Sequence, residues 1–102
     1  MPYQLTLQFQ GDSLADYDAM IALEDELIEQ LGDSADVDGH DCGFGEMNIF
    51  ILTTDPATTF QRIRPVLELA DLQMISAAYR EVDGDRYTVI WPDGLLREFQ
   101  VL

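Results

Sequence analysis

The segment 36–46 concentrates the residue types that could carry chemistry. It holds the only histidine, His40, and the only cysteine, Cys42, together with three glycines and four acidic residues. On a regular strand, side chains two residues apart share a face, so alternate side chains in this segment would converge. Imidazole and carboxylate groups are common ligands of divalent metal ions. The pattern therefore permits a divalent-metal site, and its four candidate ligands are Asp36, Asp38, His40 and Glu46.

Two other chemical interpretations of this segment are less well supported by its residues, and a third interpretation assigns it no chemical role. An EF-hand alignment on Gly39 puts a serine and a glycine where the calcium loop needs acidic ligands. A nucleophile pair of Cys42 and His40 is opposed by Asp41, because a neighbouring carboxylate raises the pKa of a thiol. The simplest interpretation is a solvated acidic strand whose glycines allow turns and bulges, with Cys42 as a small core residue. We find no complete catalytic constellation, and we expect a protein that is not an enzyme and holds no cofactor.

Charge is the most unusual property of the chain. Twenty acidic residues stand against five arginines and no lysine, which gives a net charge of −15 at pH 7. Residues 1–61 carry a net charge of −13, and residues 62–102 carry −2. A negative field repels nucleic-acid phosphates and anionic lipids and attracts basic proteins. We therefore expect no nucleic acid and no membrane as partners. The charge either recruits a basic protein or only confers solubility.

A helix predicted over residues 14–31 supplies the candidate partner-binding surface. Ser13 can cap its start, apolar side chains recur every three or four residues, and Gly32 supplies its end. The other face of this helix collects acidic side chains with no basic residue three or four positions away. The candidate partner-binding residues are Asp18, Asp25, Glu26 and Glu29.

The remaining elements follow from alternation and turn signals. Pro56 suits the first position of a second helix, and Pro65 should kink or split that helix. Asp83 and Gly84 form a strong hairpin signal between two strand patterns. The strands are predicted at residues 3–10, 35–41, 47–52, 73–82 and 86–91, with 96–101 as a short edge strand or a tail.

This order predicts one α+β domain over residues 1–102: a ferredoxin-like β-α-β-β-α-β plait with an additional C-terminal β-hairpin arm. Two helices would cover one face of the sheet. The other face would be polar and open, either solvated or forming the seam of a homodimer, and without the aromatic platforms of RNA-recognition modules. Its residues on the first strand are Gln4, Thr6, Gln8 and Gln10.

The run DGHDCGFGEMNIFILTTDP at residues 38–56 resembles a group of small acidic bacterial proteins without an assigned role. The similarity extends to LEDELIEQLGD and YTVIWPDG. The resemblance implies the same plait and transfers no catalytic residue. A single cysteine, no basic leader and no long apolar run predict a cytoplasmic protein.

Three functions are open at this point. The first is a non-enzymatic protein-interaction domain, similar to inhibitor or immunity proteins, that binds a basic or amphipathic partner through the acidic helix. The second is a divalent-metal-binding domain that uses the 36–46 hairpin. The third is a regulatory domain that dimerises through its open sheet face and holds a small ligand at the seam.

Overall fold

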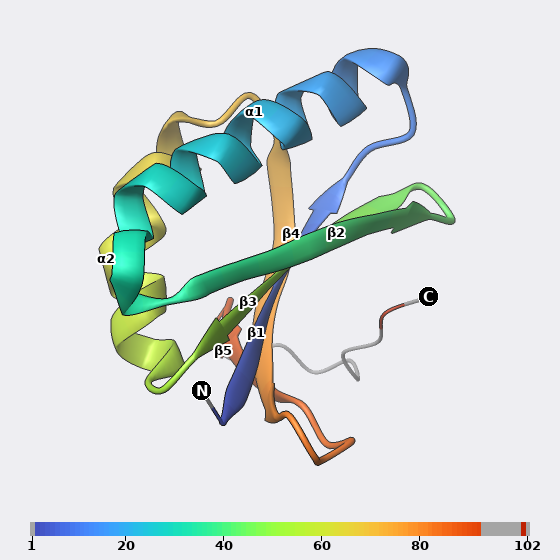
Figure 1. Cartoon of the computed structure of the whole chain (residues 1–102). Helices are drawn as coiled ribbons and strands as arrows, with labels where there is room; N and C mark the ends of the chain where they lie inside the picture. The colour runs from blue at the N-terminus through green and yellow to red at the C-terminus, as the bar shows by residue number, and fades with distance from the viewer. Residues whose placement is uncertain (1, 93–100, 102) are drawn as a thin grey trace.

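The computed structural model describes residues 2–92 and 101, and it has an α+β architecture in which two helices cover one face of a five-stranded sheet (Figure 1). The elements in chain order are β1 (Tyr3–Gln10), α1 (Leu14–Leu31), a 3-10 turn (Gly32–Ser34), β2 (Asp36–Gly43), β3 (Glu46–Thr53), α2 (Pro56–Leu69), β4 (Gln73–Glu81) and β5 (Thr88–Trp91). The strand order is β2-β3-β1-β4-β5, and every neighbouring pair is antiparallel. The predicted α+β class is confirmed. The predicted strand or tail over 96–101 extends outside the described residues.

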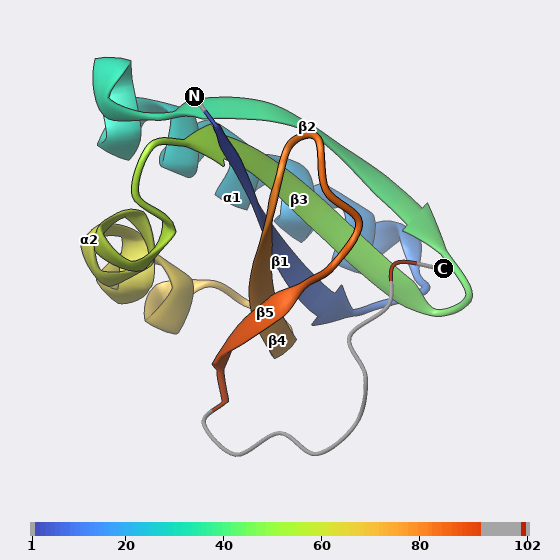
Figure 2. The same ribbon diagram turned by 90° about the horizontal axis from the view of Figure 1, so that it is seen from below.

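The core lies between the sheet and the two helices. In Figure 2, α1 lies behind β2 and β3 and α2 lies to the left of the strands, while β4 and β5 form one edge of the same sheet. Alternate side chains of the central strands point toward the helices, as a period of two requires. The buried apolar side chains of the sheet are Leu5, Leu7, Phe9, Met47, Ile49, Ile51 and Ala77, and those of the helices are Met20, Leu23, Leu27, Leu31, Phe60, Ile63 and Leu67. Burial of these side chains fixes which side of each helix remains outside.

Both helices begin with a side-chain cap. The hydroxyl of Ser13 accepts a hydrogen bond from the backbone N–H of Asp16 at 3.0 Å, and the Asp16 carboxylate accepts one from the N–H of Ser13. Asp55 caps α2, since its carboxylate accepts from the backbone N–H of Thr58 at 3.1 Å and from the Thr58 hydroxyl at 2.8 Å. These bonds favour the charged carboxylates. The Ser13 side chain lowers the pKa of Asp16 most strongly, and the Thr58 N–H does so for Asp55.

Helix α2 continues through Pro65 without a break, so of the two expected effects, a kink or a split, the split is wrong. Proline removes one backbone hydrogen bond to the carbonyl four residues earlier. Pro65 and Gln61 are both exposed, so this carbonyl lies on the solvent side of the helix, where water can replace the missing donor.

The polar face of β1 is not the open surface that alternation predicted. Thr6 and Gln8 are 0% and 1% exposed, whereas Gln4 is half-buried and Gln10 is exposed. A period of two distinguishes polar from apolar faces, but it does not reveal whether the polar side chains meet water or one another. The homodimer seam expected here would therefore have its central residues buried within the chain.

A row of hydrogen bonds across four strands pairs Gln8 on this buried polar face, whereas the buried hydroxyl of Thr6 has no hydrogen-bond partner among the described residues. Gln8 donates its side-chain amide to the side-chain oxygen of Asn48 at 3.2 Å, and the Ser76 hydroxyl donates to the Gln8 side-chain oxygen at 3.3 Å. Asn48 in turn donates to Asp41 at 3.1 Å. The row links β4, β1, β3 and β2 in their order in the sheet. Buried polar groups are tolerated when they are paired in this way.

Replacing Gln8 by alanine should destabilise the fold by about 1–3 kcal/mol, because the buried Asn48 and Ser76 side chains would each lose a partner. Gln10→Ala, on the same strand and exposed, is the matched control and should change stability by less than about 0.5 kcal/mol. Urea denaturation of both variants measures the difference. Equal effects would mean that the row is not a stabilising network.

The Asp55 cap should make α2 sensitive to acid. A lowered pKa in the folded state means that the stabilisation is fully present above the ordinary value of 3.8 and is lost as the pH falls through the folded value. Asp55→Asn keeps an oxygen acceptor that cannot be protonated in this range. We expect the melting-temperature advantage of the native chain over this variant to shrink between about pH 5 and pH 2.5. Parallel melting curves across that range would contradict the assignment.

Candidate functional site

A bulge in β2 separates the residues predicted to bind a metal. The register against β3 shifts just before Gly39, whose φ of 120° is a conformation that glycine adopts readily. Asp36 pairs with Leu52 on the face away from the helices, whereas His40 pairs with the core residue Ile49 on the helix side. The expected common face of Asp36 and His40 is therefore wrong. The extra residue of a bulge reverses the alternation that follows it.

The other two predicted ligands do not complete a site. Asp38 is exposed within the bulge, and Glu46 pairs with Gly43 at the far end of the hairpin. Within residues 2–92 and 101, no three His, Cys, Asp or Glu side chains are placed to hold a metal ion. The geometry of the described chain thus does not favour metal binding by Asp36, Asp38, His40 and Glu46.

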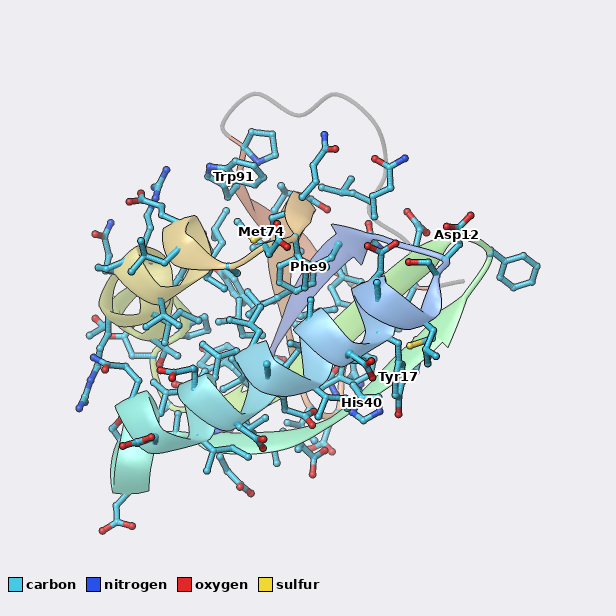
Figure 3. The ribbon with its side chains drawn as sticks, turned by 90° about the horizontal axis from the view of Figure 1, so that it is seen from above. Phe9, Asp12, Tyr17, His40, Met74 and Trp91 are labelled. Carbon is cyan, nitrogen blue, oxygen red and sulfur yellow. The ribbon has the colours of Figure 1, made fainter. Side chains whose placement is uncertain are left out.

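His40 instead ties β2 to α1. Its Nδ1 lies 3.0 Å from a carboxylate oxygen of Glu24, and its Nε2 lies 3.5 Å from the hydroxyl of Tyr17 (Figure 3). The rings of Tyr17 and His40 also meet edge to face, with centroids 5.9 Å apart. Sequence reasoning missed both partners. Their separation of seven residues, which places them on one side of a helix, was the available signal.

Cys42 has no catalytic partner among these groups. It is an exposed, free thiol, and the imidazole of His40 is engaged by Glu24 and Tyr17. Partial burial of the sulfur, followed by the Asp41 carboxylate, raises the pKa of the Cys42 thiol. A raised pKa lowers the thiolate fraction at neutral pH and with it the nucleophilic reactivity.

Three acidic side chains form a ridge on the solvent side of α1. Asp18, Asp25 and Glu29 are all exposed, and their spacings of seven and four residues place them on one side of the helix. We call these three residues the α1 ridge. Glu26, the fourth predicted partner-binding residue, lies on the flank of α1 that faces α2. The structure therefore divides the predicted acidic surface into two parts.

The cationic side chains of the described chain do not neutralise this ridge. Within residues 2–92 and 101, Arg64 forms an ion pair with Glu68, and His40 contacts Glu24 in a pair that is ionic only when the imidazole is protonated. Arg80 donates to three backbone carbonyls near the β4–β5 turn, at 2.8–3.0 Å. Arg80 therefore stabilises a turn and leaves the charge of α1 uncompensated.

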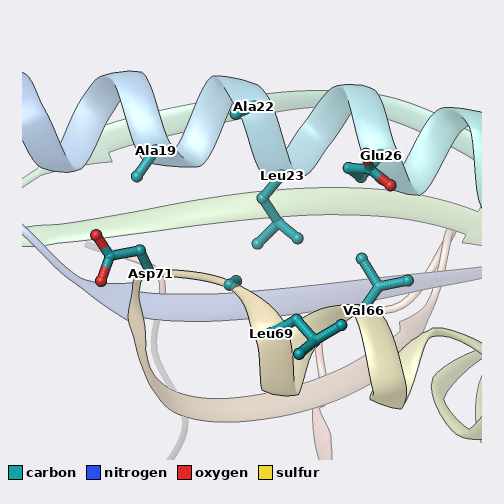
Figure 4. Close-up of a pocket in the computed structure, with 8 residues that line it drawn as sticks. Ala19, Ala22, Leu23, Glu26, Val66, Leu69 and Asp71 are labelled. Carbon is teal, nitrogen blue, oxygen red and sulfur yellow. The ribbon is translucent and has the colours of Figure 1, made fainter.

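An apolar groove runs between α1 and α2 beside the ridge (Figure 4). Its volume is about 400 Å³. Its lining residues are Ala19, Ala22, Leu23, Glu26, Val66, Leu69, Ala70 and Asp71. Sequence reasoning did not find this groove. The alanines three residues apart on α1 were a signal, but the groove exists only because α2 packs beside them.

No family model, curated protein or solved structure matches this chain. The resemblance of residues 38–56 to small acidic bacterial proteins stays a prediction. Neither α1 nor α2 is both long enough and apolar enough to span a bilayer.

Cys42 should react slowly with alkylating reagents at neutral pH. The pH at which iodoacetamide labelling reaches half its maximal rate should lie above that of free cysteine, because burial and Asp41 disfavour the thiolate. Asp41→Asn should lower this midpoint, whereas Asp36→Asn, on the same strand but remote from the thiol, should leave it unchanged. Mass spectrometry of the labelled chain gives the rates. A midpoint below that of free cysteine would contradict the assigned environment.

Proposed function

We propose that this chain is a non-enzymatic interaction domain that binds a basic or amphipathic protein partner through α1, in the manner of small inhibitor or immunity proteins. The observation that carries the proposal is the α1 ridge, whose exposed carboxylates form no ion pair with a described residue. The net charge of −13 over residues 1–61 adds a long-range field of the same sign.

The physics of exposed charges defines what the ridge can contribute. A single exposed ion pair is worth only about 0–1 kcal/mol, so three carboxylates do not hold a partner tightly by themselves. Collectively they accelerate encounter with a basic surface by a factor of about 10–10³ and fix its orientation. Such association weakens as salt shortens the Debye length to about 8 Å at physiological ionic strength. Tight binding therefore needs apolar contact as well, which favours an amphipathic partner.

We also propose that the domain is a ferredoxin-like plait that carries β5 as an added edge strand. The strand order β2-β3-β1-β4, with antiparallel neighbours and two helices on one face, supports this assignment. Cys42 is the only cysteine of the chain and a free thiol, so no internal disulfide can form, which supports a cytoplasmic location.

Charge reversal of the ridge tests the proposed function. The triple variant Asp18→Lys, Asp25→Lys, Glu29→Lys should weaken partner binding at least about tenfold, because it replaces attraction by repulsion. The matched control is Glu81→Lys, Asp83→Lys, Asp85→Lys, which changes the net charge equally at exposed positions of the β4–β5 turn. Immobilised protein captures partners from an extract of its own cells, and their affinities are then measured at low and high salt.

Circular dichroism of both triple variants confirms that the fold survives. The control should bind the captured partner within about threefold of the native chain. Capture that is insensitive to salt and to ridge reversal would contradict the proposal. Recovery of no basic or amphipathic protein would contradict it as well.

A further inference from the structure

The groove between α1 and α2 is an apolar surface with a carboxylate at each end. Figure 4 shows Asp71 and Glu26 at its two ends, with the side chains of Leu23 and Leu69 between them and Val66 across from Glu26. We propose that this groove receives a basic amphipathic helix of the partner. An apolar side chain of that helix inserts between α1 and α2, and a Lys or Arg on each side of it reaches Glu26 or Asp71. This inference rests on the proposed function and names the chemistry of the partner.

The walls of the groove suit an aliphatic side chain that arrives from outside. Ala19 and Ala22 leave room along α1, because their side chains end at Cβ. Leu23, at 4% exposure, closes the floor. Leu69 forms part of the opposite wall and is 89% exposed, so it has apolar surface left to bury. A partner side chain in this position would remove water from both helices at once.

The charges at the ends set the spacing that a partner must match. Ala19, near the Asp71 end in Figure 4, and Glu26 are seven residues apart on α1, a span of about 10 Å along a helix axis. Lys or Arg residues at positions i and i+7 of a partner helix have the same separation. Positions i+3 and i+4 of that helix lie between them on the same side. Leucine there meets the apolar walls.

The negative charge of the two carboxylates also determines which ligands can occupy the groove. Glu26 and Asp71 are exposed, and neither forms an ion pair with a described residue, so an anionic ligand or nucleic-acid phosphate would be repelled. A second copy of the chain would bring another net charge of −15 against the first. A cationic group on an apolar scaffold is the chemistry that complements both the walls and the ends.

A designed peptide tests the groove directly. The probe is a fluorescein-labelled helical peptide of about 20 residues with lysines at i and i+7, leucines at i+3 and i+4, and an alanine and glutamine background. One control peptide replaces both leucines by serine and keeps the charge. The other replaces both lysines by glutamine and keeps the apolar face. Fluorescence anisotropy at low and physiological salt gives the affinities for the full chain.

Two matched pairs of variants locate the binding. Glu26→Gln should weaken binding of the leucine–lysine peptide by about threefold. Glu29→Gln, which changes the charge equally but on the ridge, should weaken this binding less. Leu69→Ser should weaken it by about threefold or more, whereas Leu14→Ser, also an exposed leucine but outside the groove, should not. Both control peptides should bind more weakly than the parent. Methyl chemical shifts of Ala19 and Ala22 should change on binding.

Each contrary result has a distinct meaning. Two results would contradict binding in the groove: equal affinity of the serine peptide and the parent peptide, or equal effects of Glu26→Gln and Glu29→Gln. Both results would still be compatible with charge-driven binding by the ridge. If leucinamide binds as tightly as the peptide, the proposal that the occupant is a helix is wrong, and the groove is a site for a small cation. Failure of every lysine peptide to bind would overturn the groove inference, while ridge-dependent capture of a basic protein would preserve the proposed function.

Discussion

Burial of one apolar stripe of α1 against the sheet is the constraint on which the surface of this molecule depends. Met20, Leu23 and Leu27 are almost fully buried, and a helix with 3.6 residues per turn then has no rotational freedom left. One flank must face β2, where Glu24 meets His40. The other flank must face α2 and form the groove, and the side opposite the stripe becomes the acidic ridge. The β2-facing flank, the α2-facing flank and the ridge thus all follow from the way in which one stripe of α1 packs on the sheet.

The class of fold was predictable because its signals are local and repeated. The strand at β1, the Ser13 cap and Gly32 end of α1 and the place of Pro56 at the start of α2 each agree with the final structure, which is typical of sequences whose local and global preferences coincide. The bulge at Gly39 was not predictable in this way, since a period of two carries no information about one extra residue. The buried row around Gln8 escaped for a related reason. Polar residues that pair across strands and polar residues that meet water produce the same pattern.

The candidate site was predictable to the extent that it lies on one helix. The periodicity of α1 alone assigns Asp18, Asp25 and Glu29 to its exposed side. The different place of Glu26 depends on α2, whose groove-lining residues lie about 40 positions later in the chain. The expected common face of Asp36 and His40 was wrong because it required an uninterrupted strand, and the sequence does not reveal the bulge that interrupts it. Sequence patterns specify faces of elements, whereas sites arise where faces of distant elements meet.

The contact between ridge and groove explains why acidity and apolar surface occur together on α1. Unpaired carboxylates oppose folding through self-repulsion, and scattering them over the chain would confer solubility with less local repulsion. Leu69 is 89% exposed, so it buries little apolar surface within the domain. We propose that the two features act together on one partner. In the proposed function, the ridge accelerates encounter and excludes anionic surfaces, and the groove supplies the apolar burial that charge cannot. Glu26 borders both surfaces, so a partner that satisfies it must bring a cation and an apolar side chain to the same place.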